Sequence, residues 1–364
     1  MSGKIKIGIS QGDMNGIGYE LILKALMENK LAELCTPIIY GSAKAAAYHR
    51  KTLQLPESPI QRINSAKDAL EGKSYIINCL SDDIRIELGK ATTHSGECAV
   101  LCLEHATQDL KNGLIDALVT APLNKSVVQS ENFKFPGHTE YLMSQFNSKE
   151  VLMFLVNPLM RIGVVTGHIP VSAISSSLTK EKILQKLRIM NQSLRKDFGI
   201  RKPKIAVLGL NPHCGDDGLI GNEEQKIIIP AIEAAKEENI IANGPFPADG
   251  FFGSASYTKF DGVLAMYHDQ GLAPFKALDV EHGVNYTAGL PVIRTSPDHG
   301  TAFEIAGQNI ADISSFLESI YMAIDIHKNR ALYKEITKNP LKKYEINQGQ
   351  VDESIDFAAI EEGN

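Results

Sequence analysis

Short runs of aliphatic and β-branched residues alternate with longer amphipathic stretches along most of the chain. The buried-strand candidates include "KIKIGIS", "DALVTAP", "RIGVVTG", "KIAVLGL" and "DGVLAMY". Apolar residues at helical spacing predict long helices over 179–198, 223–238 and 311–329. Strands that alternate with helices of this length indicate an α/β fold with a largely parallel sheet.

Length and charge narrow the classes of protein to which the chain can belong. Its 364 residues allow two or three domains at roughly 100–200 residues per domain. A net charge of −6 and a pI near 6.0 argue against a nucleic-acid or anionic-membrane partner. No apolar run approaches the ~18–20 residues of a membrane span, and the N-terminal "MSGKIKIGIS" enters a strand pattern without a signal-peptide core. We therefore expect a cytoplasmic protein with reduced cysteines.

Three histidines follow three predicted strands at the same point of each. His168 follows "RIGVVT", His213 follows "KIAVLGL", and His268 follows "DGVLAMY". The carboxyl ends of parallel strands face the ligand crevice of such folds. A single histidine there is more often structural, but three in equivalent places favour a metal site. Neutral imidazole binds zinc and similar ions, and three protein ligands with one open position are typical of a catalytic centre.

The N-terminal "GISQGDMNGIGYE" has a strand, then Gly12, Gly16 and Gly18, then a helix. Its glycine spacing differs from the dinucleotide-binding fingerprint, and a tight turn needs glycine whether or not a ligand binds. The start of the following helix is the alternative, as an anion site.

Two further features have competing interpretations. Cys98 and Cys102 are four residues apart on a predicted helix, a spacing that suits either a metal or, more simply, two small core residues. His299, in "SPDHGTAFEIAG", either caps a helix or lines a site.

Several separated motifs together resemble one family, the 4-hydroxythreonine-4-phosphate dehydrogenases of pyridoxal phosphate biosynthesis. The resemblance runs from Gly8 to about Ala306. Its blocks, in chain order, are "GDMNGIG", "TAPLNK", "GHTEYL", "TGHIPVSAI", "LNPHCGDDGLIGNEE", "GPFPADGFF", "YHDQGLAPFKAL" and "VNYTAGLPVIRTSPDHGTAFEIAG". Eight blocks in order are not accidental.

The resemblance implies an isocitrate/isopropylmalate dehydrogenase-like fold, with two α/β domains around a central cleft. It divides the chain into a discontinuous α/β domain, 1–130 with 285–340, and a second α/β domain, 131–284, that carries the metal and dimer contacts. Residues 341–364 form a polar, acidic tail. The family is homodimeric, and its active site lies at the subunit interface. His168 and His213 are then expected from one chain and His268 from its partner.

The resemblance also assigns roles to residues. The metal ligands are His168, His213 and His268, and the ion is one divalent metal per site (Zn, Mg, Mn or Co). The substrate-binding residues are His138, Thr139, Lys276, Asn285 and Arg294. Lysine and arginine suit a substrate with phosphate and carboxylate groups. Considered alone, Lys276 and Arg294 would be surface charges and Thr139 a helix N-cap.

The implied reaction is NAD- or NADP-dependent oxidation of 4-phosphooxy-L-threonine to 2-amino-3-oxo-4-phosphooxybutanoate. That product decarboxylates to 3-amino-2-oxopropyl phosphate, on the route to pyridoxine 5'-phosphate. Asp249 and Lys276 are the candidates for the general base. The alternatives are a sister dehydrogenase acting on 4-phosphorylated threonate or erythronate, and a non-catalytic homologue that retains the metal.

Overall fold

The computed structural model of the chain describes residues 3–27, 30–57, 59–129, 133–135 and 137–340, and the predicted tail at 341–364 lies outside them. The strands are β1 (Lys6–Ser10), β2 (Thr36–Gly41), β3 (Ile60–Ile63), β4 (Ser74–Asn78), β5 (Ala117–Thr120), β6 (Leu152–Val156), β7 (Arg161–Thr166), β8 (Lys204–Leu208), β9 (Ile241–Phe246), β10 (Gly262–Tyr267), β11 (Val284–Ala288) and β12 (Arg294–Pro297). The α-helices are α1 (Gly18–Met27), α2 (Lys30–Leu34), α3 (Ala43–Thr52), α4 (Thr93–Lys111), α5 (Lys125–Val128), α6 (His138–Gln145), α7 (Ile174–Ser177), α8 (Lys180–Lys196), α9 (Ile229–Glu237), α10 (Ala248–Gly253), α11 (His268–Leu278) and α12 (Ser314–Ile336).

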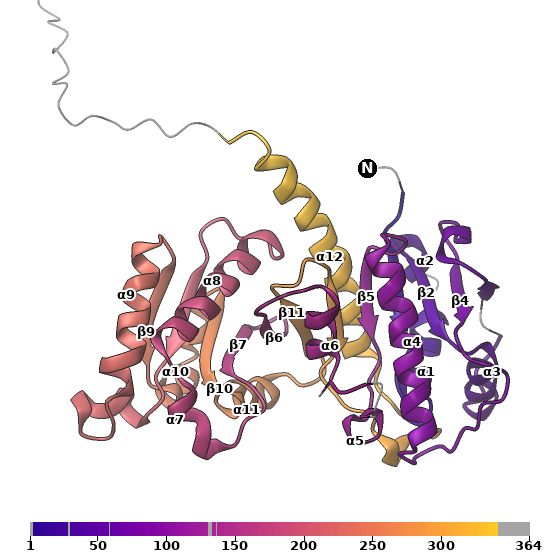
Figure 1. Cartoon of the computed structure of the whole chain (residues 1–364), viewed down its shortest axis with the longest axis horizontal. Helices are drawn as coiled ribbons and strands as arrows, with labels where there is room; N and C mark the ends of the chain where they lie inside the picture. Colours follow the sequence, from indigo (N-terminus) through magenta and orange to yellow (C-terminus); the bar gives the residue numbers. More distant parts are fainter. Residues whose placement is uncertain (1–2, 28–29, 58, 130–132, 136, 341–364) are drawn as a thin grey trace, which may run out of the picture.

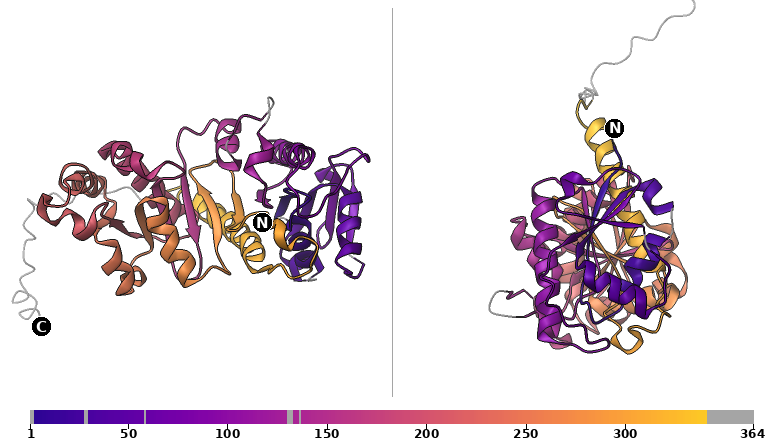
Figure 2. Two further views of the ribbon diagram at one scale, coloured as in Figure 1. Left: turned by 90° about the horizontal axis from the view of Figure 1, so that it is seen from below. Right: turned by 90° about the vertical axis from the view of Figure 1, so that its right-hand side faces the viewer.

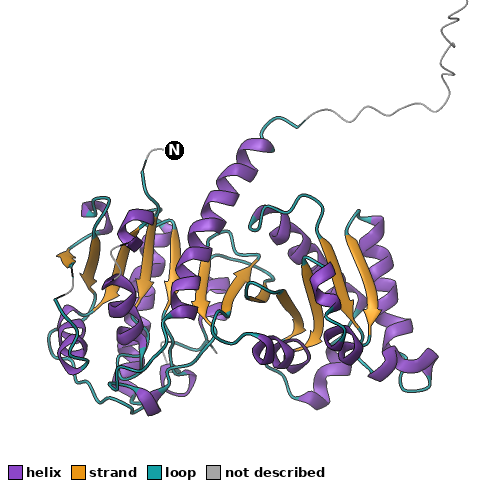
Figure 3. Cartoon of the chain, turned by 180° about the vertical axis from the view of Figure 1, so that it is seen from behind, coloured by secondary structure: helices purple, strands orange, loops and turns teal. Residues whose placement is uncertain are grey.

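A single 12-stranded sheet runs through the molecule in the order β3-β4-β2-β1-β5-β12-β11-β6-β7-β10-β8-β9. Helices flank it in two lobes (Figure 1), and the strands continue as one row from lobe to lobe (Figure 3). The outer strands pair in parallel, as the sequence predicts, but β11 is antiparallel to both β12 and β6, and β6 is antiparallel to β7. The α/β class is confirmed, with an antiparallel centre that the sequence pattern did not predict.

The three long helices predicted from the sequence are present. α8 falls within 179–198, and α9, preceded by a π-helical turn at Glu224–Ile228, falls within 223–238. α12 begins at Ser314 and continues to Ile336, beyond the predicted end at 329. Among the described residues, no helix has both the length and the apolar character needed to cross a bilayer.

Packing on the two faces of the sheet is unequal, and this determines where a cavity can form. On one face, a single apolar cluster joins both lobes and includes side chains of α1, α8, α9 and α12. On the other face, the larger clusters of the described residues lie apart, one under α4 and α6 and one under α10 and α11, and a smaller cluster lies between α1, α3 and α4. The end-on view in Figure 2 shows helices on both sides of the twisted sheet. The interval between the two larger clusters lies over the antiparallel centre.

β11 is also where the predicted domain boundary falls, since 284 and 285 are adjacent in this strand. Val284 pairs with Pro297 of β12 on one side and with Val156 of β6 on the other. Backbone hydrogen bonds of one sheet therefore cross the boundary. The division into 1–130 with 285–340 and 131–284 stays a prediction.

Candidate active site

A cavity of about 320 Å³ lies over the antiparallel centre of the sheet. Its floor comes from side chains on one face of the central strands: Arg294 and Ser296 of β12, Asn285 of β11 and Met153 of β6. Side chains alternate between the two faces along each strand, so the neighbouring residues point to the opposite face. There Ile293 and Tyr286 join the continuous apolar cluster. The central cleft that the resemblance implies is thus present.

The five predicted substrate-binding residues all line this cavity, although they come from four separate segments of the chain. They are His138 and Thr139 from α6, Lys276 from α11, Asn285 from β11 and Arg294 from β12. α6 begins at His138 with Gly137 as its N-cap. Thr139 is therefore inside the helix, and the simpler interpretation of Thr139 as an N-cap is wrong.

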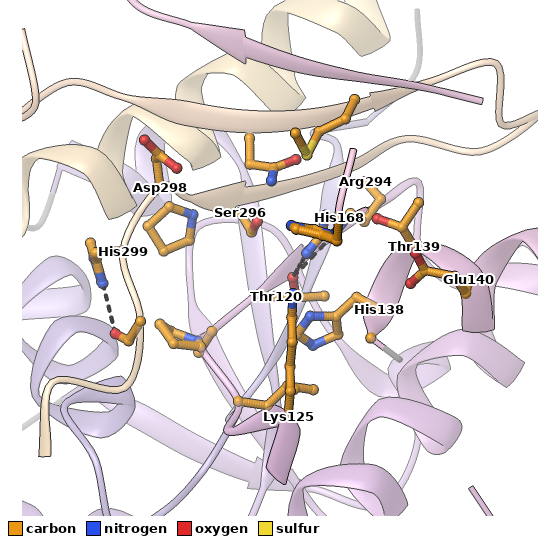
Figure 4. Close-up of a pocket in the computed structure, with 18 of the residues that line it drawn as sticks. Thr120, Lys125, His138, Thr139, Glu140, His168, Arg294, Ser296, Asp298 and His299 are labelled. Atoms are coloured by element: carbon orange, nitrogen blue, oxygen red, sulfur yellow. Dashed lines mark hydrogen bonds between the residues drawn. The ribbon is translucent and has the colours of Figure 1, made fainter. Parts of the chain in front are cut away.

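Arg294 is a buried guanidinium, only 4% exposed, on the floor of the cavity. Its Nε and one terminal nitrogen donate to Thr120 Oγ1 at 3.1 and 2.8 Å (Figure 4). Its other terminal nitrogen donates to Thr287 Oγ1 at 3.3 Å. No carboxylate of the described residues forms an ion pair with it. Burial lowers the pKa of Arg294 to about 10. A buried cation held by hydroxyl groups and lacking a counter-ion is an anion-binding group.

Other charges surround Arg294. Burial, followed by the charges of Arg294 and Lys125, holds the pKa of His138 well below its usual range, so that this imidazole is neutral. Lys276 Nζ lies 3.2 Å from Asp298 Oδ2. Burial raises the pKa of Asp298, whereas Lys276 opposes that shift.

Two of the predicted metal ligands lie together, and the third does not. The rings of His168, after β7, and His268, at the start of α11, have centroids 5.3 Å apart. His168 also lines the cavity. The Nδ1 of His268 is 2.7 Å from Asp269 Oδ1. A proton donated from Nδ1 to this carboxylate leaves the Nε2 lone pair free for a metal.

His213 is exposed and lies outside this pair. Across the described residues, no three His, Cys, Asp or Glu side chains converge closely enough to hold a metal ion. The resemblance implied that His168 and His213 share a chain while His268 enters from the partner. The adjacency of His168 and His268 within one chain favours a different partition, with these two ligands from the same subunit; which subunit supplies each ligand stays a prediction.

The loop that carries His213 has an unusual backbone. His213, Cys214, Gly215, Asp216 and Asp217 all have positive φ, between 44° and 81°. Four of these five residues are not glycine, so the conformation is strained and must be held by its surroundings. Buried Glu224 holds it: its Oε1 accepts hydrogen bonds from the backbone N–H groups of Leu210 and Asn211, both at 2.7 Å.

Asp249, the second predicted general base, is exposed on α10 and does not line the cavity. It lies instead near the His213 loop: burial, then the charges of Glu224 and Asp249, raise the pKa of the Cys214 thiol. The predicted site residues therefore form two groups. One surrounds the cavity, and the other comprises His213 and Asp249.

Several cavity residues had no assigned role in the sequence. Lys125 and Glu140 belong to the blocks "TAPLNK" and "GHTEYL", so the signal was present, but no role followed from it. The sequence left two interpretations of His299, a helix cap and a residue that lines a site. It lines the cavity, with Nδ1 bonded to Gly300 O at 3.1 Å and a buried Nε2 that has no hydrogen-bond partner in the described residues (Figure 4).

The glycine loop at 12–18 is a buried support of the cavity wall rather than an anion site. Residues 7–23 are buried throughout. Asp13 N donates to Pro122 O at 2.9 Å, and Ile17 N donates to Thr301 O at 3.0 Å. A Cβ at Gly16 would lie 2.6 Å from Thr301 O. The glycines thus permit close packing, and the expectation of an anion at this helix start is wrong.

The two cysteines at helical spacing follow the simpler interpretation. Cys98 and Cys102 are buried on α4 in an apolar cluster with Met14 and Tyr19. All five cysteines of the chain are free thiols.

Comparison with known proteins gives a consistent result. The family model described as "Pyridoxal phosphate biosynthetic protein PdxA" matches residues 33–323. The chain is 53% identical over 341 residues to a 4-hydroxythreonine-4-phosphate dehydrogenase of Bacteroides thetaiotaomicron, covering 93% of each. It is 40% identical over 330 residues to a D-threonate 4-phosphate dehydrogenase of Cupriavidus necator, covering 89% of this chain and 98% of that one. The crystal structure of 4-hydroxythreonine-4-phosphate dehydrogenase from Klebsiella pneumoniae superposes with a TM-score of 0.79 at 34% identity, covering 90% and 98%.

Proposed function

The chain belongs to the family of the pyridoxal phosphate biosynthetic protein PdxA, and from that premise we propose that it oxidises 4-phosphooxy-L-threonine in pyridoxine 5'-phosphate biosynthesis. The observation that carries the proposal is the small cavity around Arg294, a buried cation that forms no ion pair within the described residues. A substrate with phosphate and carboxylate groups supplies the missing negative charge.

A divalent metal fits the residues beside the cavity. His168 and His268 are adjacent, and Asp269 orients the second ring. We propose that His213 of a second subunit completes the ligand set, with Asp249 following it into the same site. The ion would be Zn, Mg, Mn or Co. The strained, fixed loop around His213 supports this role, because such strain concentrates where a side chain must be presented for function.

A nicotinamide cofactor, NAD or NADP, completes the requirements of a dehydrogenase. The cavity offers two buried polar atoms, His299 Nε2 and Asn285 Oδ1, that have no hydrogen-bond partner in the described part of the chain and suit polar ligand groups. Once bound beside His168 and His268, a divalent metal would supply Lewis-acid chemistry that lowers the pKa of a substrate hydroxyl, and a nicotinamide would supply the hydride acceptor.

The remaining steps belong to the chain and the substrate. Arg294, Lys125 and Lys276 hold the anionic groups, and the neutral His138 can donate or accept a hydrogen bond beside them. Asp249 from the second subunit takes the proton of the C3 hydroxyl; the alternative base is Lys276 as a neutral amine, in which case Arg294 and Lys125 hold the anionic groups without it. The oxidised substrate is a β-keto acid: its C–C bond to the carboxylate breaks, CO₂ leaves, and the ketone takes the electron pair. Protonation then gives 3-amino-2-oxopropyl phosphate.

The test of this proposal is a turnover assay with 4-phosphooxy-L-threonine and 4-phospho-D-threonate side by side, with NAD and with NADP. We expect faster turnover of the amino substrate, loss of activity after chelation, and recovery when a divalent ion is added. Preference for phosphothreonate would instead support the sister function, which the similarity to the Cupriavidus relative favours. Absence of turnover with either substrate would support a non-catalytic homologue.

The free thiols are in keeping with a cytoplasmic location, which we propose with the function.

Replacing Lys276 with alanine is expected to raise KM for the phosphorylated substrate at least ~10-fold, because a charge-assisted contact is worth about 1.5–3 kcal/mol. Steady-state kinetics measure the effect. Lys259→Ala, which removes an exposed lysine outside the cavity, is the matched control. An unchanged KM for Lys276→Ala would exclude substrate recognition by Lys276.

A further inference from the structure

The cavity contains a carboxylate that the proposed chemistry does not use. Glu140 lies in the first turn of α6, next to Thr139, and lines the cavity (Figure 4). The other carboxylate lining the cavity, Asp298, is already paired with Lys276. Within the described residues, Glu140 forms no hydrogen bond and no ion pair. An unpaired anion therefore lies in a pocket whose other side chains otherwise favour anions.

The field of Glu140 reaches the centre of the cavity. Burial lowers the pKa of Arg294 to about 10. The negative charge of Glu140 is the one charge that opposes this shift. Glu140, Arg294 and His168 all line the same cavity. A ligand bound in this cavity over Arg294 therefore lies within reach of the charge of Glu140.

The charges of the proposed substrate match this arrangement. Its phosphate and carboxylate are anions that pair with arginine and lysine, whereas its α-ammonium requires an anion. The sister substrate, 4-phosphothreonate, carries a neutral hydroxyl at that carbon. We propose that Glu140 binds the α-ammonium group and thereby selects 4-phosphooxy-L-threonine over 4-phosphothreonate. This inference rests on the proposed function and adds its specificity-determining residue.

A purely structural role for Glu140 makes a different prediction. An acidic residue in the first turn of a helix interacts favourably with the helix dipole. Losing that interaction would lower the stability of the protein, or would reduce kcat/KM for both substrates equally. Only recognition of the ammonium group makes the loss depend on the substrate.

The experiment compares Glu140→Gln with the wild type on both substrates, using the full chain and the same cofactor and metal. We expect kcat/KM for 4-phosphooxy-L-threonine to fall at least ~10-fold, the size of one charge-assisted contact. For 4-phosphothreonate, kcat/KM should stay within about twofold or rise. Glu104→Gln, on the exposed side of α4, makes the same charge change away from the cavity and should leave both values unchanged.

The outcomes separate the two proposals. A wild type that prefers the amino substrate, with a Glu140→Gln variant that keeps this preference, would overturn the role of Glu140 alone. Equal losses on both substrates, with a lowered melting temperature, would assign Glu140 to helix stability. A wild type that prefers 4-phosphothreonate would overturn both the proposed function and this inference.

Discussion

Two inactive proteins, His168→Ala and His213→Ala, are expected to recover roughly a quarter of the wild-type activity once their subunits have been exchanged in a dimer. The reason is the separation of the predicted ligands into two groups, His168 with His268 and His213 apart. In a mixed dimer, one site receives an intact His168–His268 pair and an intact partner His213, while the other site receives both lesions. Half of the dimers are mixed, and each has one working site.

A second mixture controls this result. His168→Ala and His268→Ala damage the same pair, so every site of a mixed dimer keeps a lesion and activity should stay absent. Alone, each of the three variants should lose turnover and bound metal while keeping the circular dichroism of the wild type. Metal content is measured by emission spectrometry. Recovery with His168→Ala plus His268→Ala, but not with His168→Ala plus His213→Ala, would return His268 to the partner subunit.

Replacing Arg294 with methionine is expected to reduce activity and to stabilise the ligand-free protein. We expect kcat/KM to fall by about 100-fold or more, since a bidentate, charge-assisted contact is lost. The free energy of unfolding should rise by about 1–3 kcal/mol, because an apolar side chain replaces a desolvated cation that has no ion pair in the described residues.

Urea unfolding and steady-state kinetics on the same preparations measure the two effects. Arg294→Lys is the control, because it keeps the charge and loses the fork that meets Thr120 and Thr287. Lower stability of Arg294→Met would show that the guanidinium serves the fold through those hydroxyl groups. Unchanged kcat/KM would remove Arg294 from substrate recognition.

The sequence predicted the parts of the fold that repeat a simple pattern. β7, β8 and β10 are apolar on both faces, so each of them stands out in the sequence as a continuous apolar run. The ends of these strands, and the three histidines that follow them, could therefore be located from the sequence. The central strands were harder to predict because their function disturbs the pattern. Polar side chains lie on the cavity-facing side of β11 and β12: Asn285 and Arg294 line the cavity, and Thr287 accepts a hydrogen bond from Arg294. Because of these polar residues, the sequences of β11 and β12 lack the apolar pattern that is typical of a buried strand.

The candidate site was predictable as a set of residues, and less so as an arrangement. The motifs identified His138, Thr139 and Arg294, but motifs carry no information on which subunit supplies a ligand. That information depends on the conformation of the loop. The left-handed run from His213 to Asp217 contains only one glycine, so the sequence gives little sign of this conformation. Glu140 and Lys125 were missed for another reason: acidic and basic residues at helix starts are common, and only the cavity distinguishes these two.

The pairing of β11 with β12 and with β6 has a consequence for how ligands enter. A hinge between the lobes would have to twist or break one of these two ladders, so their hydrogen bonds oppose a large rotation of one lobe against the other. We expect opening by elastic flexing of the sheet or by movement of the walls above it. The floor, with Arg294 and Asn285, lies on the strands that these ladders hold together. We therefore expect binding to be preorganised at the floor, with induced fit at the rim.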